Sequence, residues 1–464
     1  MEPFLIGDIL KRIDGKLLSG TQNTIVECVS IDSRKIKKNC LFVPLVGKKT
    51  NAHSFINNVL NNGASAVLTQ EKAIEYPESK TVIYVNNTLK ALQNIALWYR
   101  RKFSLHVIGI AGSVGKTTTK DMVASVLSQK FKVMKTKKNF NSQIGLPLTI
   151  LNLNKNYEIA VLELGISEPN EMIKLAQIAL PNSAVITNIG SSHIENFKEK
   201  SEIYKEKLHI TDVLNKNSSL FLNGDDEILL SAKNDVNNKI IYFGFNSNND
   251  IKAANLKMFK NKTIFTFKNK NIEKQIVLNL PGKHNIYAAL ISIGTAVNFG
   301  LSFKEIQLGL NGYSGTPMRQ QVYHLENLTL IDDSYNANPD SIKSAINTLE
   351  QVAGGHRKLV VLADVLELGD ISDEEHYKLG VDLAQNNIDI LLTVGEKAKN
   401  ILAGLKNSGS KTKKMSFKNK EEAFSVLKNI ISKDDTILVK GSRGMKMDKM
   451  VKMILNDVDK KSKQ

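Results

Sequence analysis

The chain has 464 residues, of which 42% are hydrophobic. This length predicts about three domains, and the apolar content excludes a disordered chain. No apolar run reaches the roughly 18 residues of an ordinary transmembrane helix, and the first residues lack the pattern of a secretory signal. The two cysteines, Cys28 and Cys40, are too few for a disulfide framework and lack metal-ligand spacing, so we expect a reducing cytoplasm and no membrane insertion.

The chain is strongly basic, with 63 Lys and Arg against 46 Asp and Glu and a formal net charge of +17. A charge of this size would suit a nucleic-acid-binding protein. The lysines are scattered along the whole chain, however, without an arginine cluster or an aromatic ladder. Net charge alone concerns solubility and steering, so the pattern favours a compositional bias and predicts no nucleic-acid partner. A P-loop protein that depends on nucleic acid is kept as the alternative.

The first hundred residues combine short strands with turns. Apolar runs at 41–45 and 81–85 predict strands. Residues 52–60 predict a helix, ended by the Asn-Asn-Gly turn at 61–63. We expect a small α/β domain over residues 1–102.

A second region extends over residues 103–315. A buried strand at 106–110 enters a glycine-rich turn, and a helix is predicted over 118–130. Alternation of strands with helices predicts a mostly parallel sheet covered by helices on both faces. Residues 251–280 alternate polar and apolar positions, which predicts a small antiparallel insert. The other elements expected here are strands at 158–164, 184–189, 219–222 and 240–245, and a helix at 284–298.

The third region, residues 316–464, repeats the alternation of strands and helices and predicts a Rossmann-like domain. It contains no GxGxxG fingerprint, so dinucleotide binding has no support there. The expected strands are 328–332, 359–362, 388–394 and 436–440, and the expected helices are 340–352, 373–386, 396–405, 420–431 and 447–455.

The strongest functional signal is the glycine-rich turn before the second region's first helix. A strand precedes it and a helix follows it, as in a P-loop, whose backbone N–H groups bind phosphate oxygens. Lys116 would reach the β- and γ-phosphates, and Thr117 would offer its hydroxyl to Mg²⁺. The usual pattern has glycine at position 110, where this chain has isoleucine. The alternative is a plain corner with a surface lysine. The predicted phosphate-binding residues are Gly112, Ser113, Val114, Gly115, Lys116, Thr117 and Thr118.

Two polar residues follow strands of the same predicted sheet. Glu163 ends one strand, and His193 lies just beyond the next. Taken alone, Glu163 could be a surface carboxylate and His193 a hydrogen-bonded loop histidine. Because both follow strands parallel to the P-loop strand, we expect them at the edge where an open parallel sheet places its site.

With these motifs the chain resembles the Mur ligases, the ATP-dependent amino-acid ligases of peptidoglycan synthesis, over nearly its whole length. The resemblance implies that the N-terminal domain binds a UDP-sugar substrate, with Ser33 and Arg34 as its residues, and that the glycine-rich loop binds ATP. The segments that carry it are Asp32-Ser33-Arg34, Leu41–Gly47 with His53 and Phe55, Gly112–Lys120, Asp332–Pro339, Leu366–Gly369 with His376, and Val439–Gly444.

The resemblance also implies a metal site. Thr117 and Glu163 would hold the Mg²⁺ that bridges the ATP phosphates, and His193 would help to hold a second Mg²⁺. The family uses a carbamylated lysine, which Lys207 matches best, with Lys205 as a rival. A carbamate supplies anionic oxygen to a hard divalent cation. His209 stands where the family usually has glutamate.

Three further residues resemble the family's nucleotide contacts. Asn285 would hydrogen-bond adenine, while Arg319 and Asp333 would approach the nucleotide from the third domain. An arginine grips phosphate in a forked pair, and a carboxylate accepts from ribose hydroxyls. The alternative for Asp333 is a place in the capping region before Pro339, where Asp is favoured in any case.

Within the family, Ser334–Pro339 and Leu366–Gly369 resemble the members that add D-alanyl-D-alanine to UDP-N-acetylmuramoyl-tripeptide. The implied reaction passes through an acyl phosphate, with Lys116, Glu163, His193 and Lys207 as catalytic groups and a third domain that closes over the site. The family tendency is monomeric. A ligase adding the third amino acid and an inactive scaffold are the alternatives.

Overall fold

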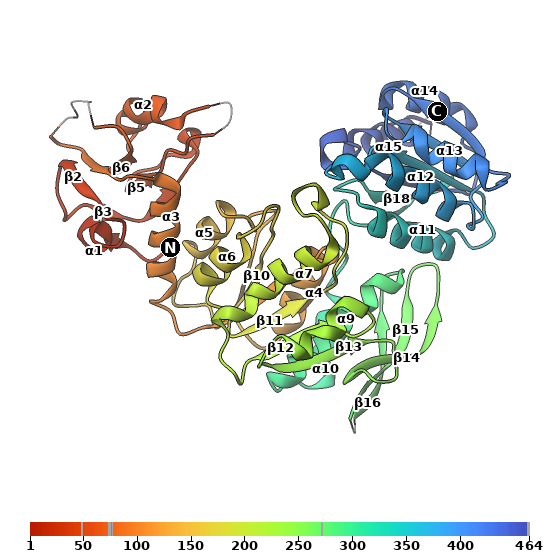
Figure 1. Ribbon diagram of the computed structural model, residues 1–464, viewed down its shortest axis with the longest axis horizontal. Helices are drawn as coiled ribbons and strands as arrows, with labels where there is room; N and C mark the ends of the chain where they lie inside the picture. Colours follow the sequence, from red (N-terminus) through yellow and green to blue (C-terminus); the bar gives the residue numbers. More distant parts are fainter. Residues whose placement is uncertain (48–49, 73–75, 77, 271, 462–464) are drawn as a thin grey trace.

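The computed structural model describes residues 1–47, 50–72, 76, 78–270 and 272–461. Its strands form sheets of five, nine and six strands that succeed one another along the chain, together with a short β1–β3 pair (Figure 1). The predicted α/β architecture in three parts is confirmed, while the boundaries 1–102, 103–315 and 316–464 stay predictions. In the described ranges, no helix is both long and apolar enough to cross a membrane.

The N-terminal sheet has the strand order β2-β7-β6-β5-β4 and is parallel except at β2. The predicted strand at 41–45 ends early, at Phe42, two residues before Pro44, which cannot donate to a ladder. The predicted helix at 52–60 begins with a 3₁₀ turn. The elements are β1 (Phe4–Leu5), α1 (Ile6–Leu10), β2 (Lys16–Ser19), β3 (Ile25–Val26), β4 (Cys28–Ser30), β5 (Cys40–Phe42), α2 (Ile56–Asn61), β6 (Ala66–Thr69), β7 (Thr81–Tyr84) and α3 (Thr88–Arg100), with 3₁₀ turns at Ser33–Lys35 and Ala52–Phe55.

Cys28 and Cys40 form a disulfide bond between the neighbouring parallel strands β4 and β5. The connection enclosed by this bond contains Asp32, Ser33 and Arg34. The sequence predicts a reducing compartment because two cysteines are too few for a disulfide framework. One disulfide bond is still no framework, but the pairing of Cys28 with Cys40 goes against that argument. Two cysteines twelve residues apart meet here only because the strands that carry them are adjacent in register.

The central sheet has the order β16-β15-β14-β13-β12-β11-β8-β10-β9 and is parallel from β9 to β14. The predicted antiparallel insert exists, but its strands extend this sheet instead of forming a separate one. The elements are β8 (His106–Ala111), α4 (Lys116–Leu127), β9 (Val133–Lys135), α5 (Gly145–Ile150), β10 (Ile159–Glu163), α6 (Met172–Ala179), β11 (Ser183–Ile186), α7 (Lys200–Leu208), β12 (Ser219–Asn223), α8 (Glu227–Leu230), β13 (Lys239–Gly244), β14 (Ile251–Met258), β15 (Thr263–Asn269), β16 (Ile272–Leu278), α9 (Lys283–Asn298) and α10 (Phe303–Asn311).

The C-terminal sheet has the order β17-β18-β22-β19-β20-β21, and only β17 is antiparallel. Successive residues of β19 point to opposite faces, so Leu359 and Val361 join one apolar core and Val360 and Leu362 the other. The elements are β17 (Gln321–His324), β18 (Leu328–Asp333), α11 (Pro339–Ala353), β19 (Lys358–Ala363), α12 (Ser372–Leu383), β20 (Ile390–Val394), α13 (Lys399–Asn407), β21 (Lys413–Phe417), α14 (Lys420–Ile430), β22 (Asp435–Lys440) and α15 (Asp448–Lys461).

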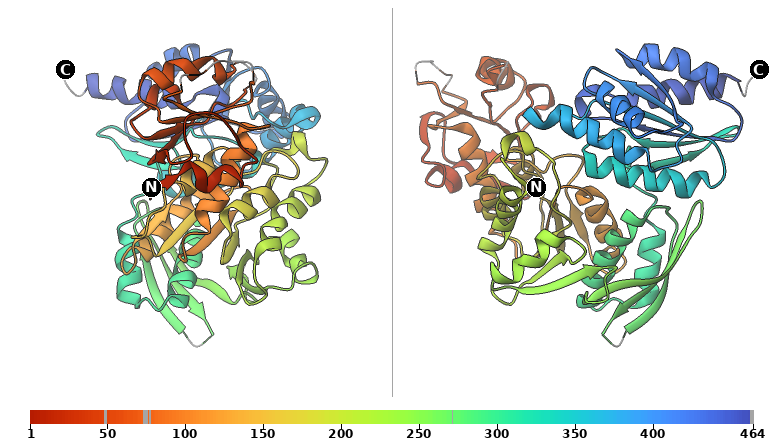
Figure 2. Two further views of the ribbon diagram at one scale, coloured as in Figure 1. Left: turned by 90° about the vertical axis from the view of Figure 1, so that its left-hand side faces the viewer. Right: turned by 45° about the vertical axis from the view of Figure 1, so that its right-hand side comes forward.

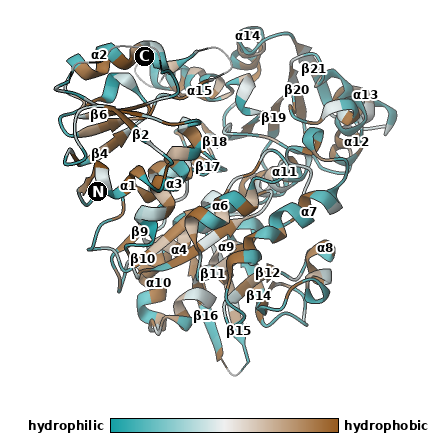
Figure 3. Cartoon of the chain, turned by 60° about the vertical axis from the view of Figure 1, so that its left-hand side comes forward, coloured by the Kyte–Doolittle hydropathy of each residue, from teal (hydrophilic) through white to brown (hydrophobic). Residues whose placement is uncertain are grey.

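The central domain lies between the other two, which occupy opposite ends of the molecule (Figures 1 and 2). Helix α3 joins the N-terminal sheet to it: the Tyr99 hydroxyl donates to the Leu153 carbonyl at 2.8 Å, and Arg100 Nε donates to the Ala179 carbonyl at 2.9 Å. One apolar core continues across this junction. Figure 3 shows the apolar residues gathered on the sheets and on the helix faces that cover them.

Candidate active site

The glycine-rich loop joins β8 to α4 at the carboxyl edge of the central sheet. Gly112 and Gly115 have φ values of 138° and 85°, a region that favours glycine. A side chain on Gly112 would also collide with Thr187, so glycine is needed there for space as well. Ile110, where the usual pattern has glycine, lies inside β8 and is fully buried. The turn itself therefore begins at Gly112.

The Lys116 side chain folds back over this loop. Its Nζ donates to the carbonyls of Gly112 at 2.7 Å and Ser113 at 3.3 Å. Burial lowers the pKa of Lys116, and the nearby charge of Glu163 opposes that shift. The loop thus places an ammonium group at the N-terminus of α4, where backbone N–H groups and the helix dipole attract phosphate.

Thr117 and Glu163 meet next to the loop. The Thr117 hydroxyl donates to Glu163 Oε2 at 3.0 Å, and Asn141 Nδ2 donates to Oε1 at 2.7 Å. Glu163 is only 2% exposed, at the end of β10, which pairs directly with β8. Arg319 reaches the same place from the start of the C-terminal region, and its Nη2 lies 3.5 Å from the Thr117 hydroxyl. Hydroxyl and carboxylate oxygens are the ligands that Mg²⁺ prefers.

Lys207 on α7 faces the interior and is 3% exposed, whereas its rival Lys205 is exposed. Burial lowers the pKa of Lys207 to about 7, and the charge of Lys116 acts in the same direction. The two amines are therefore close enough to interact. His209, the departure from the family pattern, points elsewhere and pairs with Asp212 at 2.7 Å.

His193 lies in the connection after β11, with a left-handed φ of 61°. Its Nδ1 is 2.7 Å from Glu367 Oε2, a C-terminal-domain carboxylate whose pKa is lowered by this contact. In the described part of the chain, no three His, Cys, Asp or Glu side chains gather into a metal cage. Any Mg²⁺ held by Thr117, Glu163, His193 or a carbamylated Lys207 therefore needs phosphate oxygens and water as further ligands, which is usual for this ion.

The predicted nucleotide contacts occupy the side of the site formed by α9 and the C-terminal sheet. Asp333 is buried and forms an ion pair of 2.6 Å with buried Lys440. Burial raises the pKa of Asp333 and lowers that of Lys440, and the pair opposes both shifts. Arg319 Cζ lies 4.0 Å from the centroid of the Tyr335 ring, and this stacking holds the guanidinium in place.

Two buried polar atoms in these segments, His284 Nδ1 and Ser334 Oγ, have no partner among the described residues. Burial, with the charge of Lys440, lowers the pKa of His284 to about 4, so its ring is neutral. Asn285 Nδ2 donates to the Pro281 carbonyl at 2.7 Å. Unsatisfied buried polar groups are costly, so a ligand group or water that reached these atoms would be stabilising.

The predicted UDP-sugar residues lie in the connection between β4 and β5 of the N-terminal sheet. Arg34 is almost wholly exposed and forms a two-pronged ion pair with Asp32, at 2.9 and 3.0 Å. These contacts lower the pKa of Asp32 to about 2. Ser33 begins the 3₁₀ turn that Asp32 caps. The structure therefore does not bring Ser33 and Arg34 to the P-loop.

Several residues of the site were not predicted from the sequence. Lys120 is buried and donates to the Thr136 carbonyl at 2.9 Å, next to Glu163. Asn141 and Glu367 contact predicted residues from distant segments. No sequence pattern pointed to Asn141, but Lys120 and Glu367 lie inside two of the segments that carried the family resemblance.

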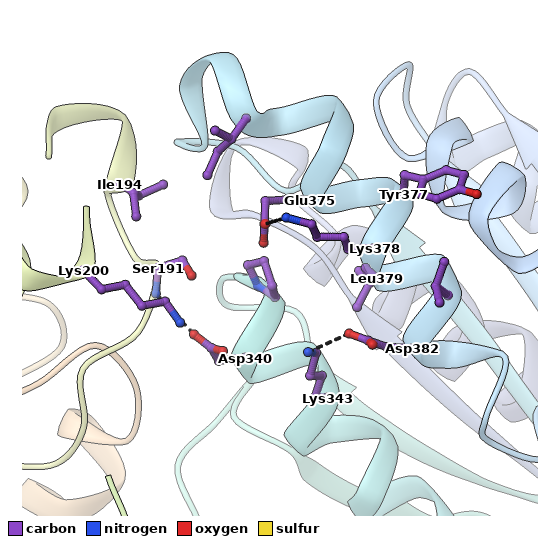
Figure 4. A pocket seen from close by; sticks show the side chains of 13 residues that line it. Ser191, Ile194, Lys200, Asp340, Lys343, Glu375, Tyr377, Lys378, Leu379 and Asp382 are labelled. Atoms are coloured by element: carbon purple, nitrogen blue, oxygen red, sulfur yellow. Dashed lines mark hydrogen bonds and ion pairs between the residues drawn. The ribbon is translucent and has the colours of Figure 1, made fainter. Parts of the chain in front are cut away.

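A cavity of about 460 Å³ lies between the central and C-terminal domains (Figure 4). Its central-domain wall contains Ser191, Ile194 and Lys200, and its opposite wall belongs to α11 and α12. Lysine and carboxylate side chains alternate around it, and Lys343 forms an ion pair of 2.6 Å with Asp382. The cavity marks the line along which the two domains meet.

A parallel sheet, a glycine-rich loop, a lysine over that loop and a Thr–Glu pair beside it define a P-loop nucleotide-binding protein. Comparison with protein families gives three successive matches: "Mur ligase family, catalytic domain" over residues 25–100, "Mur ligase middle domain" over 110–296, and "Mur ligase, glutamate ligase domain" over 318–443. The chain belongs to the Mur ligase family.

Individual proteins similar to this chain include members of one branch of the family. The chain is 36% identical over 97% of its length, and 98% of the relative's, to the UDP-N-acetylmuramoyl-tripeptide--D-alanyl-D-alanine ligase of Bacillus subtilis. It is 31% identical to the Escherichia coli protein of the same name, over 94% of this chain and 95% of that one. A crystal structure of MurF from Acinetobacter baumannii matches 98% of this chain and 99% of its own with a TM-score of 0.90 and 28% identity. MurF ligase from Thermotoga maritima in complex with ADP matches 93% and 98% with a TM-score of 0.83 and 26% identity.

Proposed function

We propose that this chain is an ATP-dependent ligase that joins D-alanyl-D-alanine to UDP-N-acetylmuramoyl-tripeptide, forming an amide bond and a pentapeptide precursor of peptidoglycan. The observation that carries the proposal is the meeting of Thr117, Glu163 and Arg319 at the P-loop, which joins two domains around one phosphate site. The names and near-complete coverage of the relatives support the choice of substrates.

The chemistry requires a carboxylate to become an electrophile. Transfer of the γ-phosphoryl group to the tripeptide carboxylate gives an acyl phosphate, and attack by the amine of D-alanyl-D-alanine then releases phosphate. Lys116 neutralises charge on the transferred group, and Arg319 adds a second cation from the C-terminal domain. Both residues act mainly through positioning and electrostatics.

The metal ligands of the proposal are Thr117, Glu163, His193 and a carbamylated Lys207, for two Mg²⁺ ions. Bound Mg²⁺ supplies Lewis-acid neutralisation of phosphate charge. Asn141 orients Glu163 by donating to Oε1. The low pKa of Lys207 supplies the neutral amine that carbamate formation requires.

On the nucleotide side, Gly112, Ser113, Val114, Gly115 and Thr118 complete the phosphate loop. We assign Asn285, Arg319 and Asp333 to the rest of ATP, which the unpartnered His284 Nδ1 supports. Ser33 and Arg34 bind the UDP part of the tripeptide substrate. The monomeric state and the cytoplasmic location remain predictions from the sequence.

The test is phosphate release from ATP and Mg²⁺ with UDP-N-acetylmuramoyl-tripeptide, in the presence and absence of D-alanyl-D-alanine. Release that needs both substrates, with a pentapeptide product identified by mass, would establish the ligase. Release stimulated by nucleic acid and indifferent to both substrates would refute it. The net charge of +17 would then become the leading clue to function.

A further inference from the structure

One of the places where the central and C-terminal domains meet is the segment 190–196, between β11 and α7. Ile194 packs against the apolar core of the C-terminal domain. The backbone N–H groups of Ser191 and Glu195 donate across the boundary. The polar contacts of this segment are Ser191 N to Asp340 Oδ2 at 3.2 Å, Asn338 Nδ2 to Ser192 Oγ, Glu195 N to the Glu367 carbonyl at 3.3 Å, and His193 Nδ1 with Glu367 Oε2 at 2.7 Å.

His193 and Glu367 stand out among these contacts. Both have left-handed backbones, with φ values of 61° and 64°, which non-glycine residues adopt at a cost. Glu367 contacts the segment twice, through its side chain to His193 and through its carbonyl to Glu195. Two residues with left-handed backbones therefore face each other across the domain boundary.

This segment and the residues just before it also contact the phosphate loop. The Ser113 N–H donates to the Asn188 carbonyl at 3.0 Å, and the Gly190 N–H donates to Ser113 Oγ at 2.8 Å. Continuous contacts therefore run from the loop that would hold ATP to Glu367 in the other domain. His193 lies between the two ends of this chain of contacts.

A histidine that binds a metal through one ring nitrogen usually donates its other N–H to a carboxylate, which fixes the ring and raises its basicity. Glu367 engages Nδ1 of His193, and no hydrogen bond from the described residues occupies Nε2. We propose that Glu367 is a positioning residue: from the C-terminal domain it orients the His193 ring and leaves Nε2 available to hold a second Mg²⁺.

This inference rests on the proposed role of His193 in metal binding. It implies that the second metal site is complete only when the C-terminal domain is docked on residues 190–196. The acyl phosphate would then form only where the domain that shields it from water is already in place. Metal binding at this site would therefore be coupled to docking of the C-terminal domain.

The experiment compares Glu367→Ala and Glu367→Gln with the full-length protein. Mn²⁺ binding is titrated by electron paramagnetic resonance in the presence of a non-hydrolysable ATP analogue, with no ligation required. We expect the weaker Mn²⁺ site to lose about 10- to 100-fold in affinity in Glu367→Ala. Glu367→Gln should lose less, because its amide oxygen still accepts from Nδ1. The matched control is Glu374→Gln, an exposed carboxylate paired with Lys378.

A double-mutant cycle separates positioning from a structural role. In a His193→Ala background, Glu367→Ala should cause no further loss of Mn²⁺ affinity, because Glu367 acts through the ring. Unchanged Mn²⁺ affinity in a folded Glu367→Ala protein would overturn the proposal, and so would tighter binding, which would mean that Glu367 competes with the metal. If the wild type binds Mn²⁺ as expected but never ligates the two substrates, the proposed function fails while this inference stands.

Discussion

Replacing Lys207 with alanine should abolish ligation, because carbamate formation needs a neutral amine and the structure supplies one. Burial and the charge of Lys116 lower the pKa of Lys207 from 10.5 to about 7. At pH 7 about half of such amines are neutral, against about 0.03% for an ordinary lysine. The buried position therefore raises the reactive fraction by roughly three orders of magnitude. Since the pKa is lowered, the neutral form is gained as pH rises through about 7 and lost below it.

The assay is phosphate release with both substrates, for Lys207→Ala and for the exposed control Lys205→Ala. We expect a loss of about 10²–10³-fold or more in Lys207→Ala, the size seen when one charge-stabilising group is removed. Short carboxylates such as acetate should restore part of the rate, and ¹³C-bicarbonate should give a carbamate signal only with Lys207 present. Full activity of Lys207→Ala without carboxylate, or a comparable loss in Lys205→Ala, would refute the reasoning.

Three other perturbations test different parts of the structure. Lys116→Ala should stop phosphate release but leave calorimetric binding of UDP-N-acetylmuramoyl-tripeptide within a few-fold, because the P-loop and Arg34 belong to different sheets; lost substrate binding in a folded variant would contradict this. Lys440→Met leaves Asp333 as an unpaired buried carboxylate and should lower the free energy of unfolding in urea by about 3–5 kcal/mol. The exposed control Lys406→Met should change it by less than about 0.5 kcal/mol, and a similar small change in Lys440→Met would show that the pair contributes little. Chelation of Mg²⁺ by EDTA should end phosphate release and added Mg²⁺ should restore it; activity that survives chelation would remove the metal from the proposal.

Local patterns predicted many of the elements that bury a continuous apolar run, although the buried strand β6 was missed. The strand–turn–helix at the P-loop and the strand before Glu163 are of this kind, and both are where the residues placed them. Strands β17 and β21 were missed because both are edge strands with polar or basic residues, as in the Lys413-Lys414 start of β21. The 251–280 insert was predicted, but a pattern inside one segment does not show which neighbouring strand it joins.

The spacing of residues along the sequence does not predict the contacts that assemble the site. Asn141 orients Glu163 across 22 residues, and Arg319 reaches Thr117 across 202. Each contact depends on how loops and domains pack, which no short-range periodicity encodes. The His193–Glu367 pair was missed for the same reason, although His193 was a predicted metal ligand and Glu367 lies in a segment that carried the family resemblance.

The neighbour of Lys207 explains why that amine faces inward. The carboxylate of Glu206 accepts from the backbone N–H groups of Asn170, Glu171 and Met172, at 2.7–2.9 Å, and so holds the N-terminal end of α6. Consecutive helical residues point about 100° apart, so this clamp fixes the rotation of α7 about its own axis. Glu206 therefore sets the direction of the Lys207 side chain, and a change at Glu206 would turn this amine away from Lys116 although Glu206 itself lies outside the P-loop.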